Sequence, residues 1–319
     1  MPYGGTQPWC PWLMPLSFMA CIVVFVYTMY VNNCPEKTGA RNCVFYNELG
    51  RFSFQPRSEN FFFGPSVKTL KEIGGLNRNL VVDKGQNYRL FSCMWLHGNV
   101  IHLIVNVLAI LLMGVRLEED YGFLKIGLLY VLSGLGANIL SCLRQAATEE
   151  TISVGASGAL FGLLGSSLSE IITNWNLYAN KCAALTTLLI VIALNLTIGF
   201  IPGVDGTAHI GGLLAGFFLG FLLLLRPQYG YFGAYYYIVP GHDLKRKKPK
   251  YQLHQQLFWV LSFVILIIGY MVGLAKLYKG ERVVLPIPSF DTKQMPNLGA
   301  AQSYNVTEKY NNTLSHIPN

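Results

Sequence analysis

The sequence predicts an all-α polytopic membrane protein, with a core of six membrane-spanning helices followed by a seventh. Of its 319 residues 52% are hydrophobic and only 13% are charged, whereas soluble domains carry about 25% charged residues. The mean hydropathy is positive, at +0.38. Crossing ~30 Å of hydrocarbon takes about 20 apolar residues, and seven runs reach or approach that length: 12–31, 97–115, 121–142, 152–173, 181–202, 206–226 and 256–277.

The first run is expected to remain as a membrane helix and not to be cleaved as a signal peptide. No lysine or arginine precedes it, and no small-residue cleavage site follows it. The long hydrophilic loop after it, residues 32–96, contains Cys34 and Cys43. These two can form a disulfide if the loop is lumenal, and Cys93 is a competing partner.

A basic run gives the expected orientation. Residues 245–250 read KRKKPK, and basic residues close to membrane spans mark the cytoplasmic side. A nuclear signal or a lipid-binding patch is the alternative interpretation of this run. Asn305 and Asn311 begin glycosylation sequons near the C-terminus, which agrees with a lumenal tail. We therefore expect a multi-pass protein of the secretory pathway, in the Golgi or the plasma membrane, with its N-terminus in the cytosol.

The chain divides at the spans into five expected segments. These are a short cytosolic N-terminus, a six-span core that includes the lumenal loop 32–96, a cytosolic basic loop, the seventh span and a lumenal tail: 1–11, 12–226, 227–255, 256–277 and 278–319.

Polar residues lie at similar depths in the second, fourth and sixth spans, which enter the membrane from the same side. Ser157 is about five residues into the fourth span, His209 about three into the sixth and His102 about five into the second. Because a helix rises 1.5 Å per residue, these offsets correspond to similar depths below the same end of the spans. Asn106 lies one helical turn beyond His102, on the same face. Polar and ionisable residues within a membrane span are costly and indicate function, so we expect these side chains to form one site.

Glycine spacing predicts close packing of the fourth and sixth spans. Gly212 and Gly216 are four residues apart in the sixth span, as are Gly158 and Gly162 in the fourth. Small residues at this spacing let two helix backbones approach each other, although a general helix-pairing motif is the alternative interpretation. Gly155 and Gly158 also leave room for backbone approach beside Ser157.

These residue types predict hydrolytic chemistry. A serine hydroxyl is a poor nucleophile until a base takes its proton, and a neutral imidazole can do so, which makes Ser157 the candidate nucleophile and His209 the candidate base. The tetrahedral intermediate needs donors for its oxyanion. His102, Asn106 and the backbone N–H of Ser157 are the candidates.

Three motifs together identify a family. They are GASG at 155–158, AHIGG at 208–212, and His97, His102 and Asn106 followed by Gly114 and Glu118. In this combination they resemble the rhomboid intramembrane serine proteases over approximately residues 85–226. The six-plus-one arrangement is similar to the eukaryotic secretase-type branch, and the segments SVGASGALFGLLG and TNWNLYANK are most similar to plant rhomboid-like proteins.

The resemblance implies a Ser157–His209 dyad without a third carboxylate, an oxyanion site from His102, Asn106 and the Ser157 amide, and no metal or cofactor. It also implies that the fifth span moves to admit a substrate helix. The lumenal loop is implied to lie partly embedded beside the core, with Tyr88–Arg89 in the place of the family's Trp–Arg pair.

One site position departs from the family pattern. Members often carry a tyrosine four residues after the nucleophile, stacked on the base histidine. Here that position is Phe161, which can stack but cannot donate a hydrogen bond.

Five further polar residues are assigned other roles. Asp205 precedes His209 by four residues, so a conventional triad is conceivable, but we expect Asp205 at the lip of the sixth span. Glu118 has the wrong depth for the site and is predicted to be structural. His97 is predicted to be interfacial, and Asn138 and Asn195 are predicted to form hydrogen bonds across helices, while the functional role of Asn195 stays open.

The leading functional hypothesis is a serine endopeptidase that cleaves single-pass membrane proteins near the lumenal end. Its expected partners are transmembrane substrates and membrane lipids and not nucleic acid, while the oligomeric state stays open. The alternative is a catalytically inactive rhomboid-like protein that binds clients and steers their trafficking. A transporter is disfavoured, because the polar residues gather on one side and no internal repeat is present.

Overall fold

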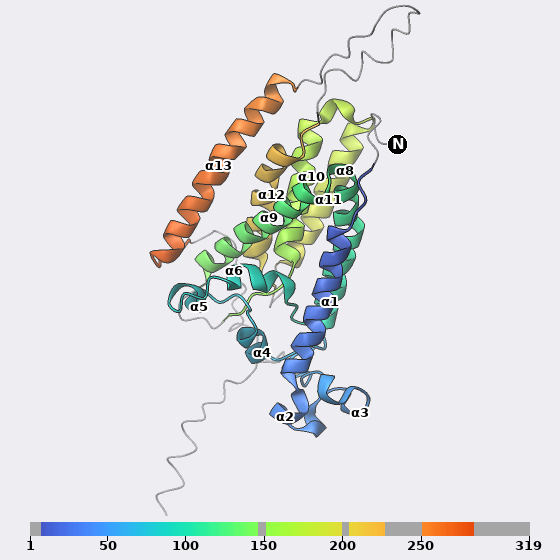
Figure 1. Cartoon of the computed structure of the whole chain (residues 1–319), viewed down its shortest axis with the longest axis vertical. Coiled ribbons are helices and arrows are strands. Elements are labelled where there is room, and N and C mark those ends of the chain that lie inside the picture. The colour runs from blue at the N-terminus through green and yellow to red at the C-terminus, as the bar shows by residue number, and fades with distance from the viewer. Residues whose placement is uncertain (1–7, 146–150, 200–203, 227–250, 284–319) are drawn as a thin grey trace, which may run out of the picture.

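The structure is a computed structural model that describes residues 8–145, 151–199, 204–226 and 251–283 (Figure 1). Within these ranges the chain is helical and contains no strand, only two isolated bridges. The basic loop residues 227–250 and both C-terminal sequons lie outside the described residues. The all-α polytopic prediction is confirmed at this level.

Five described helices are long and apolar enough to cross a membrane. They are α1 (Leu13–Asn32), the continuous α7 (Val100–Ala109), π turn (Ile110–Gly114) and α8 (Val115–Tyr121), then α9 (Phe123–Arg144), α12 (Gly206–Leu223) and α13 (Leu253–Tyr278). The other two predicted spans correspond to α10 (Ser157–Thr173), which is 17 residues long, and to α11 (Lys181–Ile198), whose apolar stretch Lys181–Thr197 is shorter than those of the five helices above. The six-plus-one count of crossings therefore stays a prediction.

The fourth span begins later than the sequence suggested. Ser157 is the first residue of α10, not the sixth of a longer helix. The residues before it are held extended, because Leu76 and Ser153 exchange backbone hydrogen bonds of 2.9 and 3.0 Å. Gly155 has a φ of +132° and donates its N–H to the Cys93 carbonyl at 2.9 Å. A helix cannot include these residues, so the serine lies at a helix N-terminus.

The centre of the bundle is the junction of α10 and α12. A Cβ atom built on Gly212 would lie 1.9 Å from the carbonyl oxygen of Gly158, and one built on Gly216 would lie 2.0 Å from that of Gly162. No side chain fits at these separations, so the two backbones are in direct contact. In Figure 1, α13 and α1 lie on opposite flanks of this central group.

The N-terminus of α1 is held by a carboxylate from the second span. Glu118 is fully buried and accepts the backbone N–H groups of Trp12, Leu13 and Met14 at 3.0, 2.8 and 2.7 Å. These are among the first N–H groups of a helix, which have no partner within the helix itself. The contacts give Glu118 the structural position that its depth in the sequence suggested.

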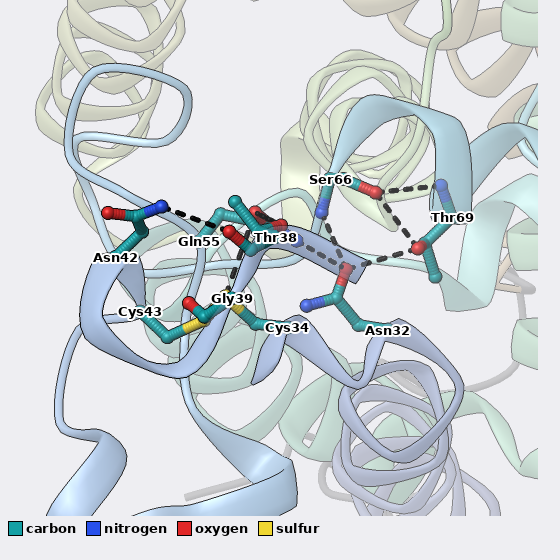
Figure 2. Close-up of a disulfide and its surroundings, with 9 residues drawn as sticks. All are labelled: Asn32, Cys34, Thr38, Gly39, Asn42, Cys43, Gln55, Ser66 and Thr69. Atoms are coloured by element: carbon teal, nitrogen blue, oxygen red, sulfur yellow. Dashed lines mark hydrogen bonds between the residues drawn. A yellow bond between two sulfur atoms is a disulfide. The ribbon is translucent and has the colours of Figure 1, made fainter. Parts of the chain in front are cut away.

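The loop after α1 folds into short helices. These are α2 (Cys34–Thr38), η1 (Ala40–Asn42), α3 (Tyr46–Leu49), η2 (Gly50–Phe52), α4 (Val67–Glu72), α5 (Arg78–Val82), α6 (Arg89–Ser92) and η3 (Cys93–Trp95). Cys34 and Cys43 are joined by a disulfide (Figure 2), whereas Cys93 is free and buried.

Asn32, the last residue of α1, connects the membrane helix to this loop. Its side-chain oxygen accepts the Ser66 backbone N–H at 2.9 Å, the Thr69 hydroxyl at 3.0 Å and the Gln55 side-chain N–H at 3.2 Å (Figure 2). Asn32 and Gln55 are almost entirely buried. One amide thus holds the two ends of the disulfide-containing segment together.

The seventh helix is attached to the core near both of its ends. Arg78 Nη2 donates to the Gly280 carbonyl at 2.7 Å just after α13, and its Nη1 donates to the Cys142 carbonyl of α9 at 3.0 Å. At the other end, Gln255 Nε2 donates to the Arg226 carbonyl at 2.9 Å. The face of α13 between these points is mostly exposed, as expected of a helix that faces lipid.

Candidate active site

Two polar side chains from α10 and α12 meet at one end of the bundle. His209 Nε2 lies 3.0 Å from Ser157 Oγ, although the two residues are 52 positions apart. Ser157 is the first residue of α10 and His209 is in the first turn of α12, so the glycine contacts between these helices bring the two together. A hydroxyl and an imidazole at this distance have the geometry of a nucleophile and its base.

Phe161 covers one face of the imidazole. It follows Ser157 by one helical turn, and its ring centroid lies 4.3 Å from that of His209 with an interplanar angle of 19°. The stacked ring fixes the plane of the imidazole, and the two residues of α10 thereby hold His209 from its edge and from its face. The phenyl ring offers no hydrogen bond.

No described carboxylate completes a triad with His209. Asp205 is the N-cap of α12 and accepts the Ala208 backbone N–H at 3.0 Å. Its other oxygen accepts the hydroxyl of Ser141 on α9. His209 Nδ1 is buried and has no hydrogen-bond partner among the described residues. Asp205 therefore lies at the start of α12, as expected, and is engaged elsewhere.

His102 lies beside the loop that carries the serine. A Cβ atom built on Gly155 would lie 2.6 Å from His102 Cε1, 2.8 Å from His102 Nε2 and 3.6 Å from Ser157 Oγ. Only glycine fits between the two side chains, and the positive φ of Gly155 also favours glycine. The His102 ring thus flanks the space next to the serine hydroxyl.

Asn106 lies one turn further along α7 and is buried. Its Nδ2 donates to the His102 carbonyl at 2.8 Å, which leaves the second amide hydrogen available. The backbone N–H of Ser157 has no partner within α10, since it belongs to the first turn. The Ser157 N–H and the second Asn106 amide hydrogen are therefore donors not used by the hydrogen bonds above, and their role as an oxyanion site stays a proposal.

His97 is fully buried, so the expectation of an interfacial histidine is wrong. Its ring contacts His102 edge to face, with centroids 5.3 Å apart. The loop that follows α1 covers this part of the chain: Asn60 Nδ2 donates to the Gly98 carbonyl at 2.8 Å, and Val100 N–H donates to the Phe63 carbonyl at 2.9 Å. Local hydropathy around His97 does not report this contact, because the covering residues are more than 30 positions earlier in the sequence.

Arg89 secures the loop that lies against the site. It is 4% exposed and donates to the carbonyls of Lys71 and Gly75, both at 2.7 Å, and to the Gln86 side chain at 2.7 Å. Leu76, the next residue after Gly75, pairs with Ser153. Arg89 thus supports the extended segment that leads to Ser157.

Sequence reasoning missed a second polar cluster. Glu170 is buried near the other end of α10 and accepts the Tyr121 hydroxyl at 2.6 Å and the Asn174 side-chain N–H at 3.0 Å. Arg226 Nε lies 3.8 Å from its carboxylate. At 1.5 Å per residue Glu170 is about 20 Å from Ser157 along the helix. The presence of a glutamate within an apolar run could have indicated this cluster from the sequence. Its partners Tyr121, Asn174 and Arg226 lie at or just after the ends of α8, α10 and α12, so Glu170 connects these ends.

The hydrogen bonds that the two asparagines make with described residues do not involve Ser157 or His209. Asn138 donates to the Leu90 carbonyl at 2.7 Å and so connects α9 to α6. Asn195 donates to the Val191 carbonyl of its own helix at 2.8 Å, so the expected bond across helices is wrong for Asn195. An amide near the lipid can satisfy its donor within its own helix when no neighbouring helix is close.

Comparisons with known proteins agree on one family. A family model described as the rhomboid domain matches residues 84–226. RHOMBOID-like protein 5 of Arabidopsis thaliana is 51% identical over 284 residues, covering 89% of this chain and 90% of the relative. RHOMBOID-like protein 2 of the same plant is 50% identical, covering 87% and 85%. Inactive RHOMBOID-like protein 8, also from Arabidopsis thaliana, is 37% identical, covering 68% and 60%.

Proposed function

This chain belongs to the rhomboid family, and from that premise we propose that it is an intramembrane serine protease that cleaves single-pass transmembrane proteins near their lumenal or extracellular end. The observation that carries the proposal is the 3.0 Å contact between Ser157 Oγ and His209 Nε2. Inactive relatives exist, so family membership alone does not establish activity, whereas a bonded serine–histidine pair supports it.

In the proposed reaction Ser157 Oγ attacks the scissile carbonyl while its proton passes to His209 Nε2. The carbonyl oxygen becomes an oxyanion that His102, Asn106 and the Ser157 N–H stabilise by donating hydrogen bonds. His209 then gives the proton to the leaving amine, which leaves an acyl-enzyme. Water, deprotonated by His209, hydrolyses this ester and regenerates Ser157. The sequence of steps uses only these groups and requires no metal or cofactor.

The buried position of the pair restricts the proposed substrates. His209 is 4% exposed, so a peptide must enter in an extended form to reach the serine. Substrate helices with glycine, proline or small residues near the cut unwind at the lowest cost. Admission past α11 is the proposed route, because only one of its described side chains, Ile192, is buried.

The proposed orientation places the Ser157–His209 end of the bundle towards the lumen, with the basic loop in the cytosol. This rests on the lysine and arginine run at 245–250 and on the sequons at Asn305 and Asn311. The proposed locations are the Golgi and the plasma membrane. Glycosidase-sensitive mobility of the full chain, lost in Asn305→Gln/Asn311→Gln, tests the orientation of the tail.

Cleavage of a reporter tests the main proposal. The full chain is co-expressed with a tagged single-pass membrane protein, and the released lumenal fragment is compared with that from Ser157→Ala. We expect release to vanish while abundance and folding stay unchanged, because alanine removes only the hydroxyl. Equal release from both would contradict protease activity and would favour the alternative of a client-binding protein.

A further inference from the structure

The imidazole that contacts Ser157 has one ring nitrogen without a hydrogen-bond partner in the part of the chain that the structure describes. For Nε2 to accept the serine proton, Nδ1 of His209 must carry the hydrogen. That nitrogen is buried and makes no hydrogen bond to any described residue. Burying an unpaired N–H is unfavourable, and the imidazolium that forms during proton transfer is more unfavourable still. Some group of negative potential is therefore needed on this side of the ring.

The C-terminal end of α11 lies on this side. Gly199 is the C-cap of α11, and a Cβ atom built on it would lie 3.4 Å from His209 Nδ1 and 2.9 Å from Gly206 Cα. A Cβ atom built on Gly206 would lie 2.6 Å from the Gly199 carbonyl oxygen. Two glycines thus bring the end of α11 into backbone contact with the first turn of α12, next to His209 Nδ1.

A helix end of this kind carries negative potential. The last four carbonyl groups of a helix have no i→i−4 partner within it; in α11 the Gly199 N–H caps those of Leu196 and Thr197. The aligned peptide dipoles still place about half a negative charge at the C-terminus. α11 is 18 residues long, and its only charged residue, Lys181, is at the opposite end. The other titratable groups that act on the imidazole are Asp205, which is engaged with Ser141 and Ala208, and His102.

We propose that the C-terminal end of α11 is the third partner of His209, in the place that a carboxylate occupies in a serine–histidine–aspartate triad. Its carbonyl dipoles orient the Nδ1 hydrogen and stabilise the imidazolium formed when Ser157 loses its proton. Gly199 and Gly206 are then positioning residues, since they allow the approach. This inference rests on the proposed protease function and deepens it.

The arrangement couples substrate admission to base strength. If α11 moves outward to admit a substrate helix, its end leaves Nδ1, and the imidazole loses the negative potential beside it. Proton transfer from Ser157 then becomes favourable only once α11 has returned to α12. Hydrolysis is thereby restricted to the closed arrangement, with the substrate inside.

The test separates base strength from substrate admission. Gly206→Ala displaces the end of α11 without adding an atom beside the imidazole, because the three atoms nearest to its Cβ all belong to Gly199. The rate at which a small fluorophosphonate labels Ser157 in the purified full chain is measured, since this probe needs the base but no opening for a helix. We expect labelling about tenfold slower. The matched control is Gly269→Ala on α13, where a Cβ has no neighbour within 4 Å.

Unchanged or faster labelling of a folded Gly206→Ala would overturn the proposal, because α11 would then act only as a barrier. A second measurement needs no variant. In the full chain labelled with ¹⁵N-histidine, the His209 Nδ1 hydrogen should be protected from exchange and shifted downfield, and a rapidly exchanging hydrogen there would also overturn it. Absence of labelling in the parent chain would instead contradict the protease function itself.

Discussion

Helices α11 and α12 are both 18 residues long and both apolar, yet they are held in opposite ways. Nine residues of α12 are buried, and three of its glycines approach α10 so closely that a Cβ atom would lie within about 2 Å of a neighbouring atom. Among the described side chains of α11 only Ile192 is buried. Ser157 and His209 lie on the closely packed pair α10–α12, whereas α11 contributes Ile192 to a small apolar cluster with Phe161 and places its C-terminal end beside His209.

For the proposed protease, this difference suggests separate roles for the α10–α12 pair and for α11. In the proposed reaction, proton transfer from Ser157 to His209 needs a distance held to within less than about 1 Å, which backbone-to-backbone packing provides. Admission of a substrate needs a boundary that separates at low cost, which a helix with few buried side chains provides. The following variants test the two halves of this comparison.

The largest effect is expected from Gly212→Ala. Its new Cβ would lie 1.9 Å from the Gly158 carbonyl oxygen, so α10 and α12 must separate. We expect a loss of roughly 3 kcal/mol in the free energy of unfolding and a fall in proteolysis of about 100-fold, because Ser157 and His209 move apart. Thermal unfolding in detergent and reporter cleavage measure the two quantities. Wild-type stability and cleavage in this variant would contradict the claim that backbone packing of α10 against α12 holds Ser157 and His209 in place.

A smaller effect on cleavage, with a comparable loss of stability, is expected from Leu163→Ala on α10, which replaces a fully buried side chain. Cavity formation should lower the free energy of unfolding by about 2–5 kcal/mol, with cleavage at permissive temperature largely kept. Leu194→Ala on α11 is the matched control, since Leu194 is 62% exposed and should change stability by less than about 0.5 kcal/mol. Equal losses in the two variants would show that α11 is packed as tightly as α10.

Phe161→Ala tests whether the stacked ring of α10 holds the His209 imidazole in place. Without the ring 4.3 Å from His209, the imidazole can rotate away from Ser157, and we expect the cleavage rate to fall by about tenfold. Phe161→Tyr keeps the stacked ring and should stay within about threefold of the parent. Single-turnover cleavage of the reporter measures both. A tyrosine variant as slow as the alanine variant would contradict a purely steric role.

The smallest effect is expected from Ile190→Ala on α11, whose side chain is 54% exposed. Stability should change by less than about 0.5 kcal/mol, and cleavage should be equal to or slightly faster than that of the parent, since the helix separates from its neighbours at no greater cost. Reporter cleavage at several substrate levels measures this. A marked loss of activity would show that this face of α11 contacts something essential.

The proximity of Ser157 and His209 was predictable because both residues are costly in lipid and because glycine spacing marks the helix faces that meet. The start of α10 was not predictable, since it depends on Leu76 pairing with Ser153 and on Gly155 adopting a positive φ. His97 was misplaced for a similar reason: the segment that covers it is distant in sequence. Hydropathy reports only the average surroundings of a helix. The start of α10 and the burial of His97 each depend on specific contacts with residues distant in sequence, which an average does not contain.

The disulfide between Cys34 and Cys43 bears on the order in which the protein assembles. The two cysteines are nine residues apart and directly follow the first span, so in the proposed orientation they reach the oxidising compartment while the ribosome is still translating the later helices. Closure of so short a loop needs no partner from the rest of the chain. We therefore expect Asn32 to bond Ser66 and Thr69 after this closure, and the remaining spans to be inserted beside a segment that is already covalently closed.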